Sequence, residues 1–126
     1  MRSVWRRVQR AVWRSRRAWE LVRLYWDTPD YDWSTIALLM RHQIRRTRLH
    51  MQEHGLAADA DRKARQMLIA ETLLGRMLDD SCYYEMAARR YPYQVRARAD
   101  LTAGLYRQDA EMLATVLRRR LRSWWD

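Results

Sequence analysis

Very few residues in this chain interrupt helices. Only three glycines and two prolines occur in 126 residues. Pro29, Gly55 and Pro92 mark the ends of stretches whose apolar residues recur every three or four positions, which is the spacing of one helix face. No useful length of β-strand alternation and no solenoid-length repeat is present. The sequence therefore predicts an all-α protein, a small bundle of about four to five helices.

The glycines, prolines and expected capping residues divide the chain into expected helices. Their ranges are 1–26, 34–54, 59–79, 81–90 and 100–124. The expected N-terminal caps are Ser34, Ser81 and Asp100, and Gly55 and Pro92 should end the second and fourth helices. Because the link between the second and third helices is short, these two should form an antiparallel hairpin. A chain of this length suits a single domain over 1–126.

Each expected helix has an apolar stripe that should face the core. In the second helix the stripe comprises Ile36, Leu39, Met40, Ile44, Thr47 and Met51. In the third it comprises Ala64, Met67, Leu68, Leu74 and Leu78. In the last it comprises Leu101, Leu105, Met112, Val116, Leu117, Leu121 and Trp124. These stripes together predict the core of the bundle.

The first 26 residues carry eight arginines against one glutamate in an amphipathic pattern. The apolar seam, spaced alternately by three and four, comprises Trp5, Val8, Val12, Ser15, Trp19, Val22 and Trp26. At 100° per residue, the arginine face lies opposite and comprises Arg6, Arg10, Arg14 and Arg17. The chain thus opens with an Arg- and Trp-rich helix that needs a partner for each face.

Three fates are open to such a helix. The helix can pack its seam in a bundle and leave the arginines exposed to solvent, it can bind phosphates, or it can lie on an anionic membrane. Packing is the commonest fate of a stripe at this spacing. The membrane is the least favoured, because the seam holds Val and Ala more than Leu or Ile. The net charge of +10 favours an anionic partner, although an arginine excess is also typical of a GC-rich genome.

Two further basic segments are candidate contacts. Arg41, Arg45 and Arg48 should share the outer face of the second helix and support the arginine face in binding. In residues 89–98, Tyr91 and Tyr93 flank Pro92 among arginines. These tyrosines either pin the loop to the core, which is the favoured interpretation, or stack on unpaired bases.

Little in the chain predicts catalysis or a metal site. His50 and His54 share a helix face, but two histidines are too few, and no Glu-x-x-His or Cys-x-x-Cys pattern occurs. The aspartates at 27, 30 and 32 suit a turn better than a calcium loop. Cys82 should be a small buried residue. We expect no enzyme activity, no cofactor and no metal.

Apolar runs and cysteine usage bear on location. The longest unbroken apolar stretches, at 37–40 and 67–70, are far too short to span a bilayer, so no transmembrane segment is expected. A single cysteine excludes an internal disulfide and fits a reducing compartment. These features predict a cytosolic protein in the producing cell.

Three segments of the chain resemble one family. WDTPDYDWSTIALLMRHQIRRTRLHMQEHG, ETLLGRMLDDSCYYEMA and MLATVLRRRLRSWWD resemble, in this order, small bacteriophage-encoded proteins of unknown function that open on an Arg- and aromatic-rich helix and close on Trp-Trp-Asp. Ser81 and Cys82 depart from the pattern, and residues 89–100 have no counterpart. The resemblance implies a phage origin, with the host cytoplasm or the virion as location, and it transfers no site residues.

The leading hypothesis is a non-enzymatic phage protein whose arginine face binds nucleic acid or an acidic protein surface. One alternative is a virion component or homo-oligomer that packs through the seam, with Trp5, Val8, Val12, Trp19, Val22 and Trp26 as interface. Another is an anti-defence protein that uses the same surfaces to bind and inhibit a host complex.

Overall fold

The structure, a computed structural model, describes residues 2–26, 33–55 and 58–124. Its elements are α1 (Arg2–Trp26), α2 (Trp33–His54), α3 (Ala60–Leu78), α4 (Ser81–Arg90), α5 (Val95–Arg120) and the 3-10 turn η1 (Arg122–Trp124). The described ranges contain five α-helices and no strand, so the predicted all-α fold is confirmed.

Residues 1–39 and residues 40–126 form two compact units, each described by itself. The first contains α1 and the start of α2. The second contains the rest of α2 with α3, α4, α5 and η1. That the whole chain forms one domain stays a prediction.

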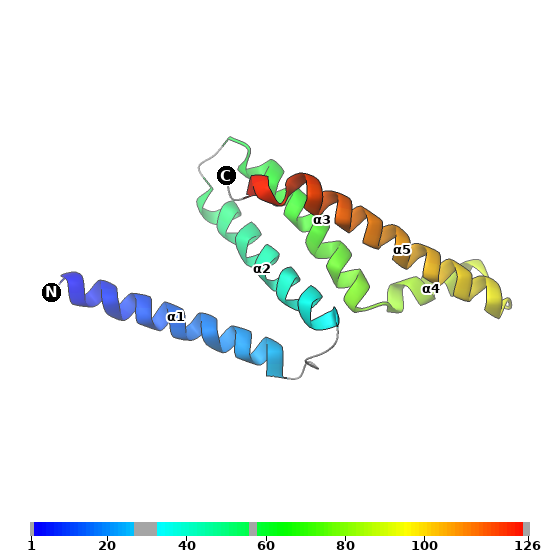
Figure 1. Cartoon of the computed structure of the whole chain (residues 1–126), viewed down its shortest axis with the longest axis horizontal. Helices are drawn as coiled ribbons and strands as arrows, with labels where there is room; N and C mark the ends of the chain where they lie inside the picture. The colour runs from blue at the N-terminus through cyan, green and yellow to red at the C-terminus, as the bar shows by residue number, and fades with distance from the viewer. Residues whose placement is uncertain (1, 27–32, 56–57, 125–126) are drawn as a thin grey trace. The chain divides into compact units, whose positions relative to one another are not determined.

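The core of the second unit is centred on α3. Met67 and Ala70 are fully buried there, and α5 packs along both α3 and α4 (Figure 1). Ile44 from α2 and Leu113 from α5 are also buried. Residues 40–54 of α2 run antiparallel to α3, as the short connection predicts (Figure 1). Trp124 is buried at the end of the chain, where its indole Nε1 donates to Gln66 Oε1 over 3.4 Å.

Gly55 ends α2, as predicted, but for reasons of space. Its N–H donates to the carbonyl of Met51 over 2.8 Å. A Cβ at this position would collide with that carbonyl oxygen and would lie 2.8 Å from the Cβ of Ala60. No glycine in the described ranges has a positive φ. The glycine therefore allows α3 to start close to the end of α2, and no left-handed backbone is involved.

Three expected caps are wrong. α2 already begins at Trp33, so Ser34 lies in its first turn. Ser81 is the first residue of α4, so the N-cap is Asp80, whose side chain makes no capping hydrogen bond. The Ser81 N–H donates to Asp79 Oδ1 over 3.3 Å. α5 begins at Val95, which places Asp100 inside the helix. Only Tyr93 and Gln94 separate Pro92 from α5, because the sequence from Val95 onward is already compatible with a helix.

Several expected core positions are also wrong. Ile36, Leu68, Met112 and Leu121 are exposed. On α5, the adjacent Leu113 is buried, as is Asp109 one turn earlier. In the middle of α5 the buried positions are therefore 109 and 113 and not 112, and the Asp109 carboxylate points at two polar partners on other helices.

Those partners are Tyr83 on α4 and Arg76 on α3. The Tyr83 hydroxyl donates to Asp109 Oδ2 over 2.6 Å, and Arg76 Nη2 lies 3.1 Å from the same oxygen. Tyr83 is fully buried and its ring meets that of Tyr106 edge-on. Because one carboxylate on α5 has a hydrogen-bond partner on α4 and an ion-pair partner on α3, this cluster fixes α3, α4 and α5 to one another.

The cluster makes stability sensitive to alkaline pH. Burial of the ring, followed by the hydrogen bond to Asp109, raises the pKa of Tyr83 above its ordinary value. Above a pH of about 10, the unfolded chain loses this proton while the folded chain keeps it. The free energy of unfolding should then fall by up to about 1.4 kcal/mol per pH unit, and the fall should be shallower in Tyr83→Phe. Urea unfolding of both proteins between neutral and alkaline pH measures this, and equal slopes would contradict it.

Candidate interaction surfaces

The large side chains of the apolar seam of α1 are exposed. Trp5, Val8, Val12, Trp19, Val22 and Trp26 are between 43% and 80% exposed. The seventh position, Ser15, donates its hydroxyl to the carbonyl of Ala11 over 2.6 Å, a bond within the helix. The seam was predicted from spacing alone, and the structure keeps all its large side chains accessible to a partner.

Three of the four residues of the arginine face are also exposed. Arg6, Arg10 and Arg14 are exposed, and no carboxylate in the described ranges pairs with any of them. Arg17 is half-buried, and its guanidinium lies over the ring of Trp13 at 5.4 Å from the ring centroid. Like charges one turn apart repel, at about 0.2–0.5 kcal/mol per pair. The face is therefore a surface whose repulsion a polyanion would relieve.

Sequence analysis missed Trp13 because it lies off the seam. At 100° per residue it falls about 140° from the centre of the seam, on the arginine side, and it is 54% exposed. A large aromatic ring exposed among arginines has little use in a core. The signal that could have found it is this displacement from the apolar stripe.

The C-terminal end of α1 and the start of α2 line one surface hollow. Leu21, Val22 and Trp26 of α1 line a surface hollow of about 330 Å³ together with Leu39 of α2. Thr35 and Ala37 on the same part of α2 are buried. This end differs from the first four turns of α1, where most residues opposite the seam are arginines.

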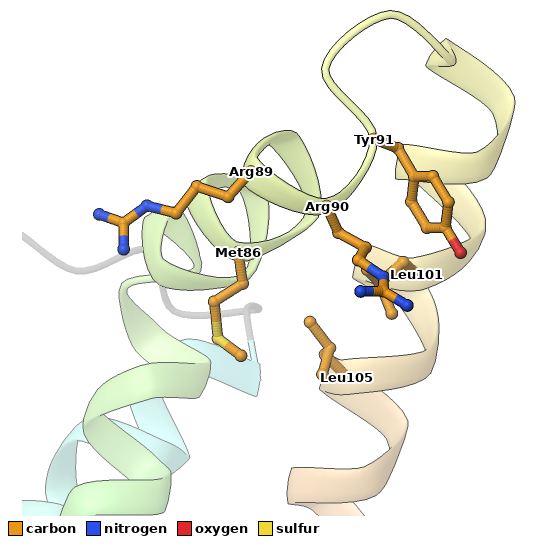
Figure 2. Close-up of a pocket in the computed structure, with 6 residues that line it drawn as sticks. All are labelled: Met86, Arg89, Arg90, Tyr91, Leu101 and Leu105. Atoms are coloured by element: carbon orange, nitrogen blue, oxygen red, sulfur yellow. The ribbon is translucent and has the colours of Figure 1, made fainter.

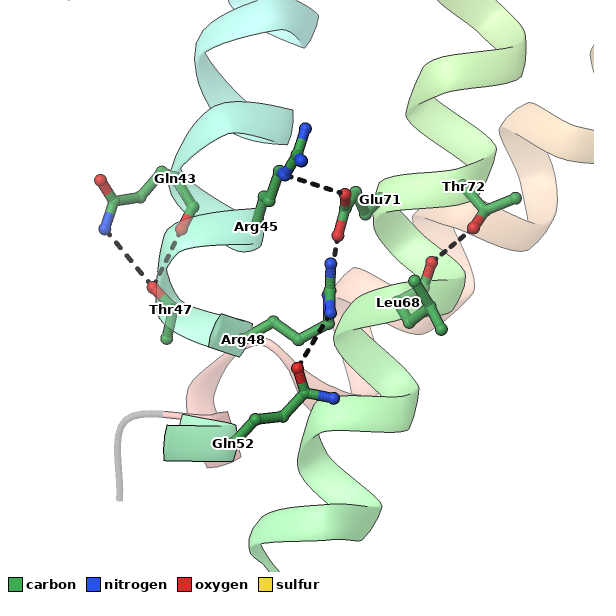
Figure 3. A network of polar contacts seen from close by, with 8 residues as sticks. All are labelled: Gln43, Arg45, Thr47, Arg48, Gln52, Leu68, Glu71 and Thr72. Carbon is green, nitrogen blue, oxygen red and sulfur yellow. Dashed lines mark hydrogen bonds and ion pairs between the residues drawn. The ribbon is translucent and has the colours of Figure 1, made fainter. Parts of the chain in front are cut away.

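The arginines of α2 do not share an outer face, which corrects the prediction for Arg41, Arg45 and Arg48. Arg48 Nε donates to Glu71 Oε2 over 2.8 Å, and only 13% of the Arg48 side chain is exposed. Arg45 is more exposed, with its Nε 3.8 Å from Glu71 Oε1. Figure 3 shows both arginines converging from α2 on the one carboxylate of α3. Arg48 also donates to Gln52 Oε1 over 3.1 Å.

The reason for this arrangement is a buried acid. Glu71 lies on the inner side of α3 and is 7% exposed, so its charge requires cationic partners. A glutamate inside the apolar run MLIAETLLG was the available signal. Arg41 is also turned inward, with its guanidinium against α3, where a Cβ at Gly75 would lie 3.1 Å from it. The second unit thus holds Arg41 and Arg48 against α3, whereas the Arg45 side chain stays largely exposed beside Glu71.

The remaining chemical candidates stay apart. His50 and His54 have ring centroids 5.0 Å apart at an exposed helix end. Within the described ranges, no group of three His, Cys, Asp or Glu side chains could hold a metal ion. Cys82 is half-buried, which corrects its predicted place in the core, and its Sγ lies 3.8 Å from the carbonyl of Asp79. The aspartates at 27, 30 and 32 lie outside the described residues.

The two tyrosines around Pro92 differ in environment. Tyr91 is half-buried and lines a hollow between α4 and α5 (Figure 2). Tyr93 is 94% exposed. The favoured interpretation, that both tyrosines pin the loop, is therefore wrong for Tyr93.

Comparison with family models, curated proteins and solved structures finds no match to this chain. The resemblance to small phage proteins and the expected lack of enzyme activity therefore stay predictions. Among the described helices, none is both long enough and apolar enough to cross a bilayer.

Proposed function

We propose that this protein binds nucleic acid through the arginine face of α1. The observation that supports this is the contrast between two sets of arginines. Arg45, Arg48 and Arg76 meet buried carboxylates on neighbouring helices, whereas Arg6, Arg10 and Arg14 are exposed on one side of α1 without such a partner in the described residues. Unneutralised arginines in a row are the electrostatic footprint of phosphate binding.

The dimensions of the face suit a nucleic acid. From Arg6 to Arg17 the helix rises about 16 Å at 1.5 Å per residue. Duplex DNA carries about one negative charge per 1.7 Å of its axis, so each arginine has phosphates within reach. Trp13 adds a ring with one side towards Arg17, and an aromatic ring beside arginines suits contacts to sugar or base.

The test is a salt series with the full chain. Labelled duplex DNA, duplex RNA and single strands are titrated, with polyglutamate as the acidic-protein counterpart. Phosphate contacts predict a linear fall of log affinity with log salt concentration, and tighter binding of nucleic acid than of polyglutamate at equal salt. Absence of nucleic-acid binding at low salt would overturn the proposal, and a preference for polyglutamate would replace the nucleic acid with an acidic protein.

Self-association through the apolar seam is the second candidate function. The seam keeps strict alternation of three and four over three heptads, and its large side chains are exposed, as in helices that pair in coiled coils. The arginine face lies on the opposite side, so both faces can be occupied together.

Sedimentation across a concentration series tests this candidate. We expect a dimer or larger oligomer that returns to monomer in the double variant Trp5→Gln with Trp19→Gln. Trp13→Gln, which removes an exposed tryptophan from the other side of α1, should leave the assembly unchanged. A monomer at every concentration would contradict self-association, as would equal loss in both variants.

A further inference from the structure

The turn between α4 and α5 carries an apolar hollow with a basic rim. The hollow, of about 500 Å³, is lined by Met86, Arg89, Arg90, Tyr91, Leu101 and Leu105. Figure 2 shows Met86 on the α4 side and Leu101 and Leu105 on α5, with the Arg90 guanidinium between the two helices and Arg89 turned outward. Apolar walls beside cationic groups suit a ligand with a flat apolar part and an anionic part.

Two residues after Tyr91, which lines this hollow, Tyr93 projects into solvent. Its 94% exposure, with Val95 at 72%, means that these side chains add almost nothing to the core. Pro92 restricts the backbone of the turn in which Tyr93 lies. The Tyr93 ring is free to stack on a planar group.

The charge of the hairpin favours an anion. Residues 89–98 contain four arginines and no acidic residue. Glu85 and Asp100 flank this segment, yet no ion pair in the described residues joins them to Arg89 or Arg96. The arginines of this segment therefore remain available for phosphates.

We infer that the α4–α5 hairpin binds single-stranded nucleic acid, with an unpaired base held against Tyr93 and the hollow and the adjoining phosphates on Arg89 and Arg90. In a duplex the base faces are stacked on one another and cannot reach such a site, whereas an unpaired strand presents them. The inference rests on the proposed function in that the ligand is a nucleic acid. It adds a second surface and a preference for unpaired strands.

The experiment compares single-stranded and duplex oligonucleotides of equal length on the full chain. Tyr93→Ala should lower the affinity for the single strand about tenfold, the typical loss for one stacked base, and leave duplex affinity unchanged. Tyr93→Trp should keep the wild-type affinity because it keeps the aromatic face. Arg89→Gln with Arg90→Gln should also weaken single-strand binding more than duplex binding.

Matched controls are present on the same helices. Tyr84→Ala removes an exposed tyrosine that lies on α4 and not in the turn. Arg119→Gln with Arg120→Gln removes two exposed arginines of α5. Both should leave the single-strand preference intact. Since Tyr93 is almost fully exposed, Tyr93→Ala should keep the wild-type helical content and melting temperature. Photo-crosslinking of a substituted oligonucleotide should label the peptide that contains Tyr93.

The outcomes separate this inference from the proposed function. Equal losses for single strand and duplex in Tyr93→Ala, or no loss with either, would overturn the hairpin site even if α1 binds nucleic acid. Loss of single-strand binding in Tyr93→Ala, combined with no effect of reversing the arginine face, would overturn the role of α1 and support the hairpin.

Discussion

Reversing the four residues of the arginine face to glutamate should weaken binding of duplex DNA by at least about 100-fold at low salt. Each of these arginines would release about 0.9 of a counterion on binding a phosphate, so the slope of log affinity against log salt should become shallower by about 3 to 4. The glutamates add repulsion to the lost attraction. Fluorescence anisotropy over a salt series measures both quantities in one experiment.

A charge-matched control distinguishes a defined surface from net charge. Reversal of Arg118, Arg119, Arg120 and Arg122 lowers the net charge by the same amount on exposed positions at the other end of the chain. This variant should keep most of its affinity and its slope. If it loses as much as the α1 variant, binding follows overall charge and the assignment to the arginine face is wrong.

Replacing Glu71 by alanine should destabilise the second unit by about 3–5 kcal/mol, the usual cost of removing one partner of a buried ion pair. Glu71 is the shared partner of Arg45 and Arg48, and the Arg48 side chain is only 13% exposed. Without the carboxylate, the Arg48 charge must either stay buried or pull out of the interface between α2 and α3. Urea unfolding followed by circular dichroism measures the loss.

Two companion variants identify the cause. Glu111→Ala removes an exposed acid of α5 and should change the free energy of unfolding by less than about 0.5 kcal/mol. The double variant Arg48→Met with Glu71→Leu should recover most of the loss, because an apolar pair of similar size avoids the buried charge. A double variant as unstable as Glu71→Ala would show that packing, and not the unpaired arginine, causes the effect.

The sequence predicted the helices better than it predicted the faces they bury. Glycine, proline and periodic apolar residues act locally, so the end of α2 at His54 and the extent of α1 follow from them. The buried faces depend also on which polar residues find partners on other helices. In the middle of α5 the buried residues are Asp109 and Leu113 and not Met112, and neither the burial of Asp109 nor its partners can be read from local spacing.

The same reasoning separates the two groups of predicted binding residues. Regular spacing over seven turns was enough to find the apolar seam and the arginine face of α1, because neither depends on another helix. Arg41 and Arg48 were placed on an outer face because their spacing matches one. The buried Glu71 on α3 draws Arg48 inward, and that contact exists only once α2 and α3 have come together.

The contact between Gly75 and Arg41 links two residues on different helices. A Cβ at Gly75 would lie 3.1–3.3 Å from three guanidinium atoms of Arg41, so alanine there requires the end of the Arg41 side chain to shift by a few tenths of an ångström. Among descendants of this chain, residues larger than alanine at position 75 should therefore occur mainly together with a shorter side chain at position 41. Substitutions at the two positions should thus be correlated, although 33 residues separate them.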